Sequence, residues 1–379
     1  MNKETNISTS IKKFSTDDFD AVVITKSHLK KYYLSANSKT YDTRCDIFNR
    51  LASYIQNENA QIILQDFFGS CALYGDCILA IEKAFGKVNW PVTWIEGNGT
   101  KKQKMTGTQL LAVSGLPVVT PIRIADRIVG SYYESDEGQI CYLGGLLPDD
   151  VTHSKMEQAA TVFQRIEDAL KLAGMDLSHL IRTWLYIDKI LDWYDDFNIV
   201  RTNFFNQKKV FEGLLPASTG IGVSNPASAA LVAAALAIKP LSGDVQISKV
   251  LSPLQCSATD YKSSFSRAVE IKFSDYRRLY ISGTASIDED GNTIHIGDVK
   301  KQIARTMEVV GAILESRHMS WKDVSRAIAY FPDLANSYLL KEYCTNKLIP
   351  DMPIAIAHGD ICRDDLLFEI EVDAAKTDT

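Results

Sequence analysis

The chain has 379 residues, 46% hydrophobic and 23% charged, which is typical of globular proteins and long enough for two or three domains. Its net charge is −6 and it has no basic run, which argues against nucleic acid or an anionic membrane as a partner. The seven cysteines are scattered and no histidines are spaced as H-x-x-x-H, so we expect no metal site and no disulfide framework. The N-terminus lacks an apolar leader and no run is apolar enough for a membrane span, so we expect a cytoplasmic protein.

The N-terminal part contains helix and strand patterns but no motif with an evident chemical role. Residues 1–60 begin as a polar arm, and residues 41–56 have the spacing of a short amphipathic helix. Residues 73–85 predict a second helix, because apolar side chains recur there at helical spacing up to a glycine. Strands are predicted at residues 88–96, 116–135 and 139–148.

From residue 154 onward, amphipathic helices alternate with strands. The predicted order is a helix at 154–174, a strand at 180–190, a helix at 193–205, a loop at 214–226 and an apolar strand at 229–238. The same order returns about 140 residues later, with Gly283 corresponding to Gly145 and Tyr330 to Tyr186. The repeat indicates two copies of one strand–helix–strand–helix–strand unit.

Two such copies predict an α+β fold in which helices pack on one face of a mixed sheet. The chain is accordingly divided into an N-terminal extension at 1–60, a first unit with an N-terminal elaboration at 61–240, and a second unit at 241–379.

The final strand, predicted at residues 358–374, places Glu369 and Glu371 on the same face. A buried carboxylate is unfavourable unless it has a partner or is protonated, and a protonated one in a pocket is a general acid. The other copy has Val232 and Ala234 at these positions, so the fold itself does not require carboxylates there. The alternative is an edge strand with two solvated glutamates.

Several motifs occurring together resemble the chorismatase family, and each repeated unit resembles the Rid (reactive-intermediate deaminase) fold, which is chorismate-mutase-like. They cover about residues 61 to 376 and read WLYIDKILDWYDDFN, LPASTGIG, SPLQCSA, FSRAVE, SGTASI and CRDDLLFEIE. The resemblance implies two Rid-like domains in tandem with a site between them, built from the second copy's last strand and the first copy's helix. It also implies cleavage of chorismate to pyruvate and a ring product without a metal or an organic cofactor. Single-unit relatives form trimers, and whether this chain is a monomer or assembles further stays open.

Cleaving an enol ether requires protonation of its terminal methylene carbon, and a buried glutamic acid that stays protonated meets this need. The resemblance implies that Glu369 is this acid, and Glu371 is the alternative. Arginines suit the two carboxylates of chorismate because the guanidinium group binds a carboxylate in a bidentate manner. The candidate substrate-binding residues are Arg201, Arg267, Arg363, Tyr186, Tyr194, Thr219 and Ala285, with Arg182 a weaker candidate. Surface ion pairs, core aromatics and an ordinary loop remain the alternatives for these residues.

Two residues bear on the ring product and point in different directions. In the family, a cysteine at the place of Cys362 accompanies 3-hydroxybenzoate formation, whereas alanine at the place of Ala285 accompanies 3,4-dihydroxycyclohexa-1,5-diene carboxylate. We predict 3-hydroxybenzoate, with Cys362 in a catalytic role, because the thiol is the chemically active difference; a buried structural thiol is the alternative. An imine or enamine hydrolase and a non-catalytic metabolite-binding protein remain alternative functions. The arginine that Rid-like hydrolases carry shortly after a conserved proline is missing after Pro216 and Pro353.

Overall fold

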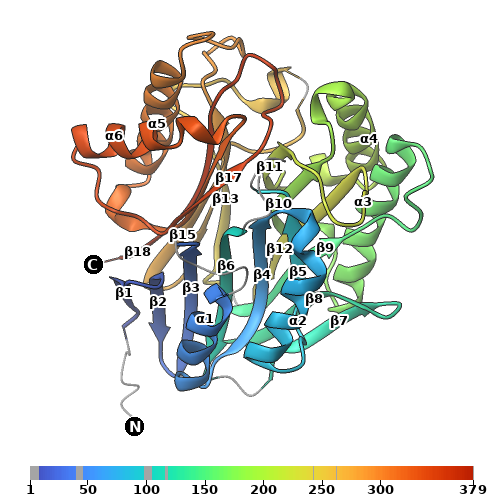
Figure 1. Cartoon of the computed structure of the whole chain (residues 1–379), viewed down its shortest axis with the longest axis vertical. Coiled ribbons are helices and arrows are strands. Elements are labelled where there is room, and N and C mark those ends of the chain that lie inside the picture. The colour runs from blue at the N-terminus through green and yellow to red at the C-terminus, as the bar shows by residue number, and fades with distance from the viewer. Residues whose placement is uncertain are drawn as a thin grey trace.

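Three six-stranded mixed sheets, each with helices on one face, make up the computed structural model (Figure 1). The structure describes residues 8–39, 46–97, 105–115, 118–241, 243–261 and 263–378. The predicted α+β class, with helices on one face of a mixed sheet, is confirmed. No helix among the described residues is long and apolar enough to cross a membrane.

The strands of the three sheets follow one common order in space. The first runs β1 (Ser10–Ser15), β2 (Asp20–Lys26), β3 (Leu29–Asn37), β6 (Met105–Ser114), β4 (Gln61–Gly69) and β5 (Val92–Ile95). The second runs β7 (Thr120–Ile124), β8 (Arg127–Ser135), β9 (Gly138–Leu146), β12 (Leu231–Lys239), β10 (Leu180–Ile187) and β11 (Ala217–Gly222). The third runs β13 (Gln246–Val250), β14 (Ala268–Lys272), β15 (Tyr276–Ala285), β18 (Glu369–Thr377), β16 (Val324–Phe331) and β17 (Ile354–His358).

Each sheet carries two helices at the same points of its topology. They are α1 (Asp46–Asn57) and α2 (Tyr74–Phe85), then α3 (Lys155–Leu172) and α4 (Tyr194–Gln207), then α5 (Val299–Ser316) and α6 (Tyr338–Asn346). In α3, Ser154 and Glu157 form a reciprocal capping box at the N-terminus, and Gly174 follows the C-terminus with φ +70°. The helices face outward and the sheets face the interior (Figure 1).

The chain therefore contains three copies of the unit, which differs from the predicted division. The predicted boundary at residue 61 falls at the start of β4, inside the first sheet. The first copy escaped detection because its first strand is polar and its first helix is short. Its edge strand β1 is mostly exposed, and α1 has 12 residues where α3 and α5 have 18.

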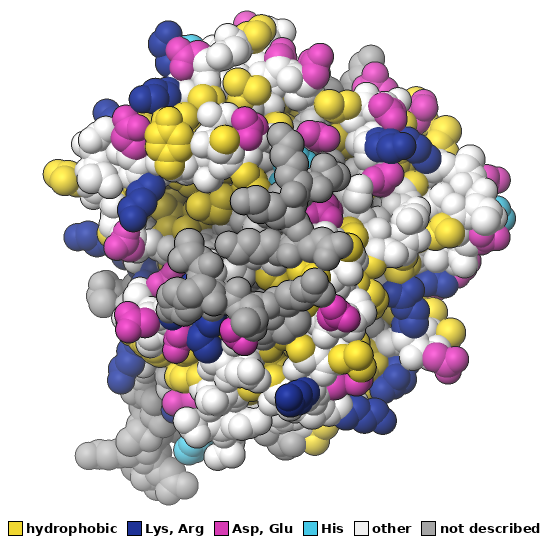
Figure 2. All heavy atoms as spheres, viewed as in Figure 1, with side chains coloured by type: hydrophobic (Ala, Val, Ile, Leu, Met, Phe, Trp, Pro, Cys, Tyr) yellow, Lys and Arg dark blue, Asp and Glu magenta, His cyan; other side chains and the backbone are white. Residues whose placement is uncertain are grey.

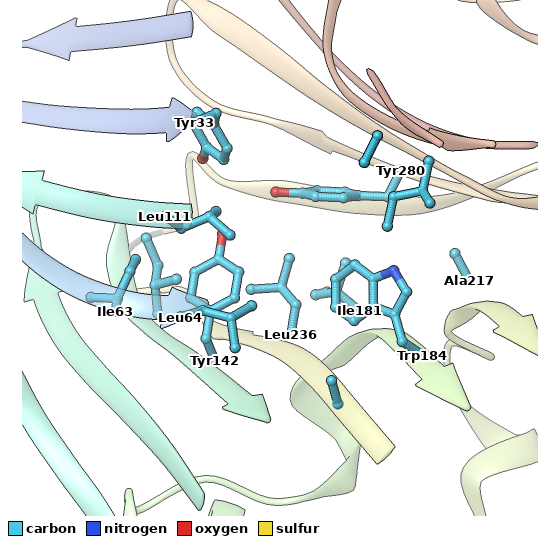
Figure 3. Packing of buried hydrophobic residues seen from close by; sticks show 14 of the residues in the cluster. Tyr33, Ile63, Leu64, Leu111, Tyr142, Ile181, Trp184, Ala217, Leu236 and Tyr280 are labelled. Carbon is cyan, nitrogen blue, oxygen red and sulfur yellow. The ribbon is translucent and has the colours of Figure 1, made fainter. Parts of the chain in front are cut away.

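The inner faces of the three sheets meet in one central hydrophobic cluster, while each unit has its own core between sheet and helices. Tyr33, Tyr142 and Tyr280 occupy corresponding positions on β3, β9 and β15. Their hydroxyl groups point toward one another at the centre (Figure 3). The three units thus surround a shared interior. The outer surface seen in Figure 2 intersperses acidic and basic side chains.

Two predicted elements need correction. The predicted loop at 214–226 contains β11, which pairs in parallel with β10 although glycine, serine and threonine supply much of its sequence. The predicted strand at 358–374 is divided, because β17 ends at His358 and β18 begins only at Glu369. Between them, Asp360 exchanges two backbone hydrogen bonds with Gly222, which draws this loop across to the second sheet.

Candidate active site

A cavity of about 170 Å³ lies between the second and third copies. A water needs roughly 10–15 Å³ by this measure, so a small organic molecule fits. Helix α4 and strand β11 form one side; β15, β18 and the loop before β18 form the other. The cavity brings together seven of the nine predicted site residues: Tyr194, Arg201, Arg267, Ala285, Cys362, Arg363 and Glu369.

Glu369, the first residue of β18, is the only carboxylate from the third copy among the described residues that line the cavity, and it is 5% exposed. Its carboxyl group occupies the space above Gly283, where a Cβ would lie 2.0 Å from Oε1. Burial, reinforced by the nearby charge of Glu371, raises the pKa of Glu369 to about 8. The side chain therefore carries a proton at neutral pH.

Glu371 lies two residues further along β18 and is fully buried. Its carboxylate lies 3.1 Å from Nη2 of Arg182 and accepts hydrogen bonds of 2.8 Å from Nη1 of Arg326 and Nε1 of Trp184. Burial opposes ionisation, but the two arginines outweigh it and hold the pKa of Glu371 below its usual value. The structure thus gives the two candidate carboxylates different states, with Glu371 a fixed anion and Glu369 a protonated acid.

Three arginines from different segments border the cavity. Arg201 on α4 donates to Oδ1 of Asn198 at 2.6 Å. Arg267 donates from Nε to the carbonyl oxygen of Cys256 at 2.9 Å. Arg363 donates from Nη1 to the carbonyl oxygen of Gly291 at 2.8 Å. These contacts fix guanidinium groups around the cavity and make it suitable for an anionic ligand.

The two candidate tyrosines lie in different places. Tyr194 opens α4 and lines the cavity, with its ring stacked on Phe197 at a centroid distance of 6.1 Å. Tyr186 on β10 is 1% exposed within the central cluster and is not among the cavity-lining residues. Burial, with Asp66 and Glu371 nearby, raises the pKa of Tyr186 well above its usual value. Tyr186 belongs to the core.

Thr219 also lies behind the cavity wall rather than in it. Its Oγ1 accepts hydrogen bonds from Nη2 of Arg182 at 2.9 Å and from the backbone N–H of Gly283 at 3.1 Å. The residue is 1% exposed and lies in the middle of β11. The segment predicted as a loop is therefore a strand at this point, and Thr219 links the second copy to the third.

Cys362 and Ala285, the two product markers, face the same cavity. Ala285 pairs directly with Glu369 across β15 and β18. Burial and the neighbouring Glu369 raise the pKa of the Cys362 thiol to about 12, so the thiol is protonated at neutral pH.

Sequence reasoning missed several lining residues, namely Asp195, Asn198, Ser263, Phe265 and Ile287. It also missed the joint role of Arg182 and Arg326, which hold Glu371. A signal for that pair was present: the arginines precede Tyr186 and Tyr330 by the same four residues in the two aligned copies.

Two family models match the chain in succession. Residues 126–237 match the model described as chorismatase FkbO/Hyg5-like, N-terminal, and residues 257–376 match the model described as endoribonuclease L-PSP. These two ranges coincide closely with the second and third copies, respectively.

Similar proteins of known name include chorismatases and a protein of the RutC family. A chorismatase of Streptomyces hygroscopicus is 27% identical over 253 residues, covering 61% of this chain and 71% of that protein. A 3-hydroxybenzoate synthase of the same species is 25% identical over 264 residues, covering 62% of this chain and 74% of that protein. A RutC family protein of Pyrococcus abyssi is 30% identical over 100 residues, covering 26% of this chain and 78% of that protein.

A crystal structure of a chorismatase has the same overall fold. It aligns with a TM-score of 0.63 at 19% identity, covering 90% of this chain and 98% of that chain. The likeness therefore extends over the first copy as well.

Proposed function

Because the chain belongs to the chorismatase family, we propose that it cleaves the enolpyruvyl ether of chorismate to pyruvate and a ring product, with Glu369 as the general acid. The observation that carries the proposal is the buried carboxyl group of Glu369, whose pKa is raised to about 8, in a cavity bordered by three arginines. A pKa of about 8 leaves roughly nine in ten Glu369 side chains protonated at pH 7.

In the proposed reaction, Glu369 transfers its proton to the terminal methylene carbon of the enol ether. The carbon–carbon double bond is consumed and an oxocarbenium ion forms next to the newly ionised carboxylate. The buried Glu371 anion adds favourable negative potential close by. Limited access of water preserves the raised pKa that the proton transfer needs.

The arginines are the proposed ligands for the two substrate carboxylates. Arg201 approaches from the second copy, and Arg267 and Arg363 approach from the third, so a bound dianion would bridge both copies. Tyr194 supplies an aromatic wall on the α4 side.

For the ring we propose 3-hydroxybenzoate as the product. Pyruvate and 3-hydroxybenzoate together contain all atoms of chorismate, whereas the dihydroxy acid consumes one water. Cys362 supports the first outcome because its thiol borders the cavity close to Glu369. Ala285 supports the second, since it lies opposite Glu369 and resembles the hydrolytic relatives.

The proposal is tested by incubating purified protein with chorismate, without added metal, and following pyruvate and ring product by liquid chromatography with mass detection. We expect pyruvate with 3-hydroxybenzoate. Glu369→Gln should lower kcat by about 10²- to 10⁴-fold because it removes the proton donor while preserving shape. Glu315→Gln, an exposed position on α5, is the matched control.

Formation of pyruvate together with the dihydroxy acid would support cleavage of chorismate but would contradict 3-hydroxybenzoate as the ring product. Absence of pyruvate from mildly acidic to neutral pH would overturn the cleavage and favour the imine hydrolase. If the unaltered protein and Glu369→Gln bind chorismate equally well and neither converts it, the chain is a metabolite-binding protein.

A further inference from the structure

A second pocket lies between the first and second copies and has a volume of about 330 Å³. Helix α2 and strand β5 of the first copy border it on one side. The second copy contributes the ends of β8 and β9, β12 and the loop before β12. The six lining residues that matter here are Tyr74, Trp94, Arg127, Gly145, Leu147 and Val232.

This pocket is the structural counterpart of the catalytic cavity, and one repeated hydrogen bond shows the correspondence. The N–H of Gly145 donates to Oγ1 of Thr93 at 3.2 Å across the first interface. The N–H of Gly283 donates to Oγ1 of Thr219 at 3.1 Å across the second. Both glycines lie on the third strand of their unit, and both threonines lie on the last strand in spatial order.

The correspondence extends to the residues that face each cavity. Tyr74 and Tyr194 are the first residues of α2 and α4. Val232 pairs with Tyr186 as Glu369 pairs with Tyr330. The position of the proton donor is therefore occupied by valine, so the second pocket has no acid at that point.

Other exchanges make the second pocket more apolar. Trp94 is found where the catalytic cavity has Gly220, and Leu147 where it has Ala285. Arg127 is the one charged side chain among the described residues that line it, whereas three arginines border the catalytic cavity. A single guanidinium group with an indole wall suits one carboxylate on a flat ring.

Trp94 contributes its aromatic ring to the wall of this pocket. Trp94 is 4% exposed, and its Nε1–H has no acceptor among the described residues. Buried donors without an acceptor are rare because they lose their hydrogen bond to water. Because this nitrogen is not accessible to a water-sized molecule, Trp94 lines the pocket with its ring and not with its N–H group.

We propose that this second pocket binds a planar aromatic monocarboxylate, with its carboxylate at Arg127 and its ring against Trp94, and does not convert it. The probe follows from this class: 3-hydroxybenzoate is planar, singly charged and carries a hydroxyl group. The proposal rests on the geometry of the first interface, and the binding measurement below does not depend on turnover of chorismate.

Binding of 3-hydroxybenzoate is measured by equilibrium dialysis and calorimetry on the full chain and three variants. Arg267→Gln weakens the catalytic cavity, Arg127→Gln weakens the second pocket, and Arg123→Gln is a matched exposed control on the same hairpin. We expect one molecule per chain to remain bound in Arg267→Gln. In Arg127→Gln the Kd of that second site should rise by about tenfold or more, the size of one charge-assisted contact.

A fourth variant, Trp94→Leu, replaces the flat aromatic wall by an aliphatic side chain, so it should weaken the second site several-fold. Dialysis and calorimetry on unaltered protein should then show two sites per chain. The proposal is overturned if all binding disappears in Arg267→Gln, or if Arg127→Gln binds like Arg123→Gln. It is equally overturned if no variant or unaltered protein binds 3-hydroxybenzoate.

Discussion

Glu369 and Glu371 are chemically identical side chains two residues apart on one strand, yet their surroundings push their pKa values in opposite directions. Glu371 has Arg182 and Arg326 within hydrogen-bonding or ion-pairing distance, while the carboxyl group of Glu369 occupies the space above Gly283. The ionised Glu371 also raises the pKa of Glu369, because a second negative charge nearby is unfavourable. The fixed anion thereby helps to keep the proposed donor protonated.

Substituting Glu371 should move the pH profile of the reaction. In the native protein, kcat/KM should fall as pH rises through about 8, where Glu369 loses its proton. Glu371→Gln removes a negative charge and leaves Arg182 unneutralised, and both effects lower the pKa of Glu369. The alkaline decline should therefore begin at a lower pH.

The measurement is kcat/KM for chorismate between about pH 5 and pH 10, with Glu315→Gln as the reference. Thermal melting in the same buffers monitors folding, since two buried arginines lose their partner. An unshifted alkaline decline in folded Glu371→Gln would contradict the coupling.

Sequence alternation predicted that both carboxylates share a face, but it could not assign their protonation. That assignment depends on Arg182 and Arg326, which come from two different copies and are separated from Glu371 by 189 and 45 residues. Tyr186 and Thr219 were predicted to bind substrate because they stand in matched motifs. Both side chains are buried and do not line the cavity. Thr219 instead accepts a hydrogen bond from Gly283 of the next copy.

At the level of elements, β15 and β18 form the platform of the site. Their pairing has a register shift between Ile281 and Thr284, and Gly283 lies within it. The absence of a side chain at Gly283 leaves room for the carboxyl group of Glu369. A bulge can redirect side chains in this way beside an active site.

Gly283→Ala should therefore abolish activity without unfolding the protein. The added Cβ would lie 2.0 Å from Oε1 of Glu369, so the carboxyl group must move. We expect kcat to fall at least about 10²-fold, since misplacing a reacting group by about 1 Å has such an effect. Gly75→Ala on α2 is the control, because its Cβ has no atom within 4 Å. Full activity in Gly283→Ala would contradict the claim that Glu369 needs the space above Gly283.

Most elements of the second and third copies were predictable because amphipathic helices and apolar strands have strong periodicity. Strand β11 was not, because Ser218, Thr219 and Gly220 resemble a loop in isolation. Its strand conformation is set by parallel pairing with β10 and by the bridge from Gly222 to Asp360. Tertiary context thus decided an element on which the cavity depends.

At the level of the whole molecule, a buried ion pair joins all three copies. Lys31 of the first copy contacts Glu137 of the second, and its Nζ donates to the hydroxyl group of Tyr276 in the third at 3.0 Å. Lys31 is 6% exposed and Glu137 is 3% exposed. Breaking this pair leaves the buried Glu137 with the more exposed Lys26, 3.7 Å away, as its remaining cation, which compensates the carboxylate less well.

Lys31→Met should lower the free energy of unfolding by about 3 kcal/mol or more, measured by urea denaturation followed by circular dichroism. The neighbouring Lys30→Met alters an exposed side chain and should change it by about 0.5 kcal/mol or less. Adding Glu137→Leu to Lys31→Met should recover much of the loss, because the buried carboxylate that lost its nearest cation disappears. Equal stability of the two lysine variants would contradict this role.

The number of copies was the largest feature that sequence reasoning did not reach. Two copies were visible through matched glycines, tyrosines and helices of similar length. The first helix of the first copy is shorter than its counterparts and its first strand is polar, so the copy becomes evident from the strand order of its sheet.

Covalent linkage of the three copies also changes what a mutation can do. In a ring of identical subunits, every substitution appears at all interfaces together, so a change that improves one site alters each of them. Here Gly107, Val232 and Glu369 occupy corresponding positions on β6, β12 and β18, and each can vary alone. Natural selection can therefore adjust one interface for catalysis while the other two diverge under separate constraints.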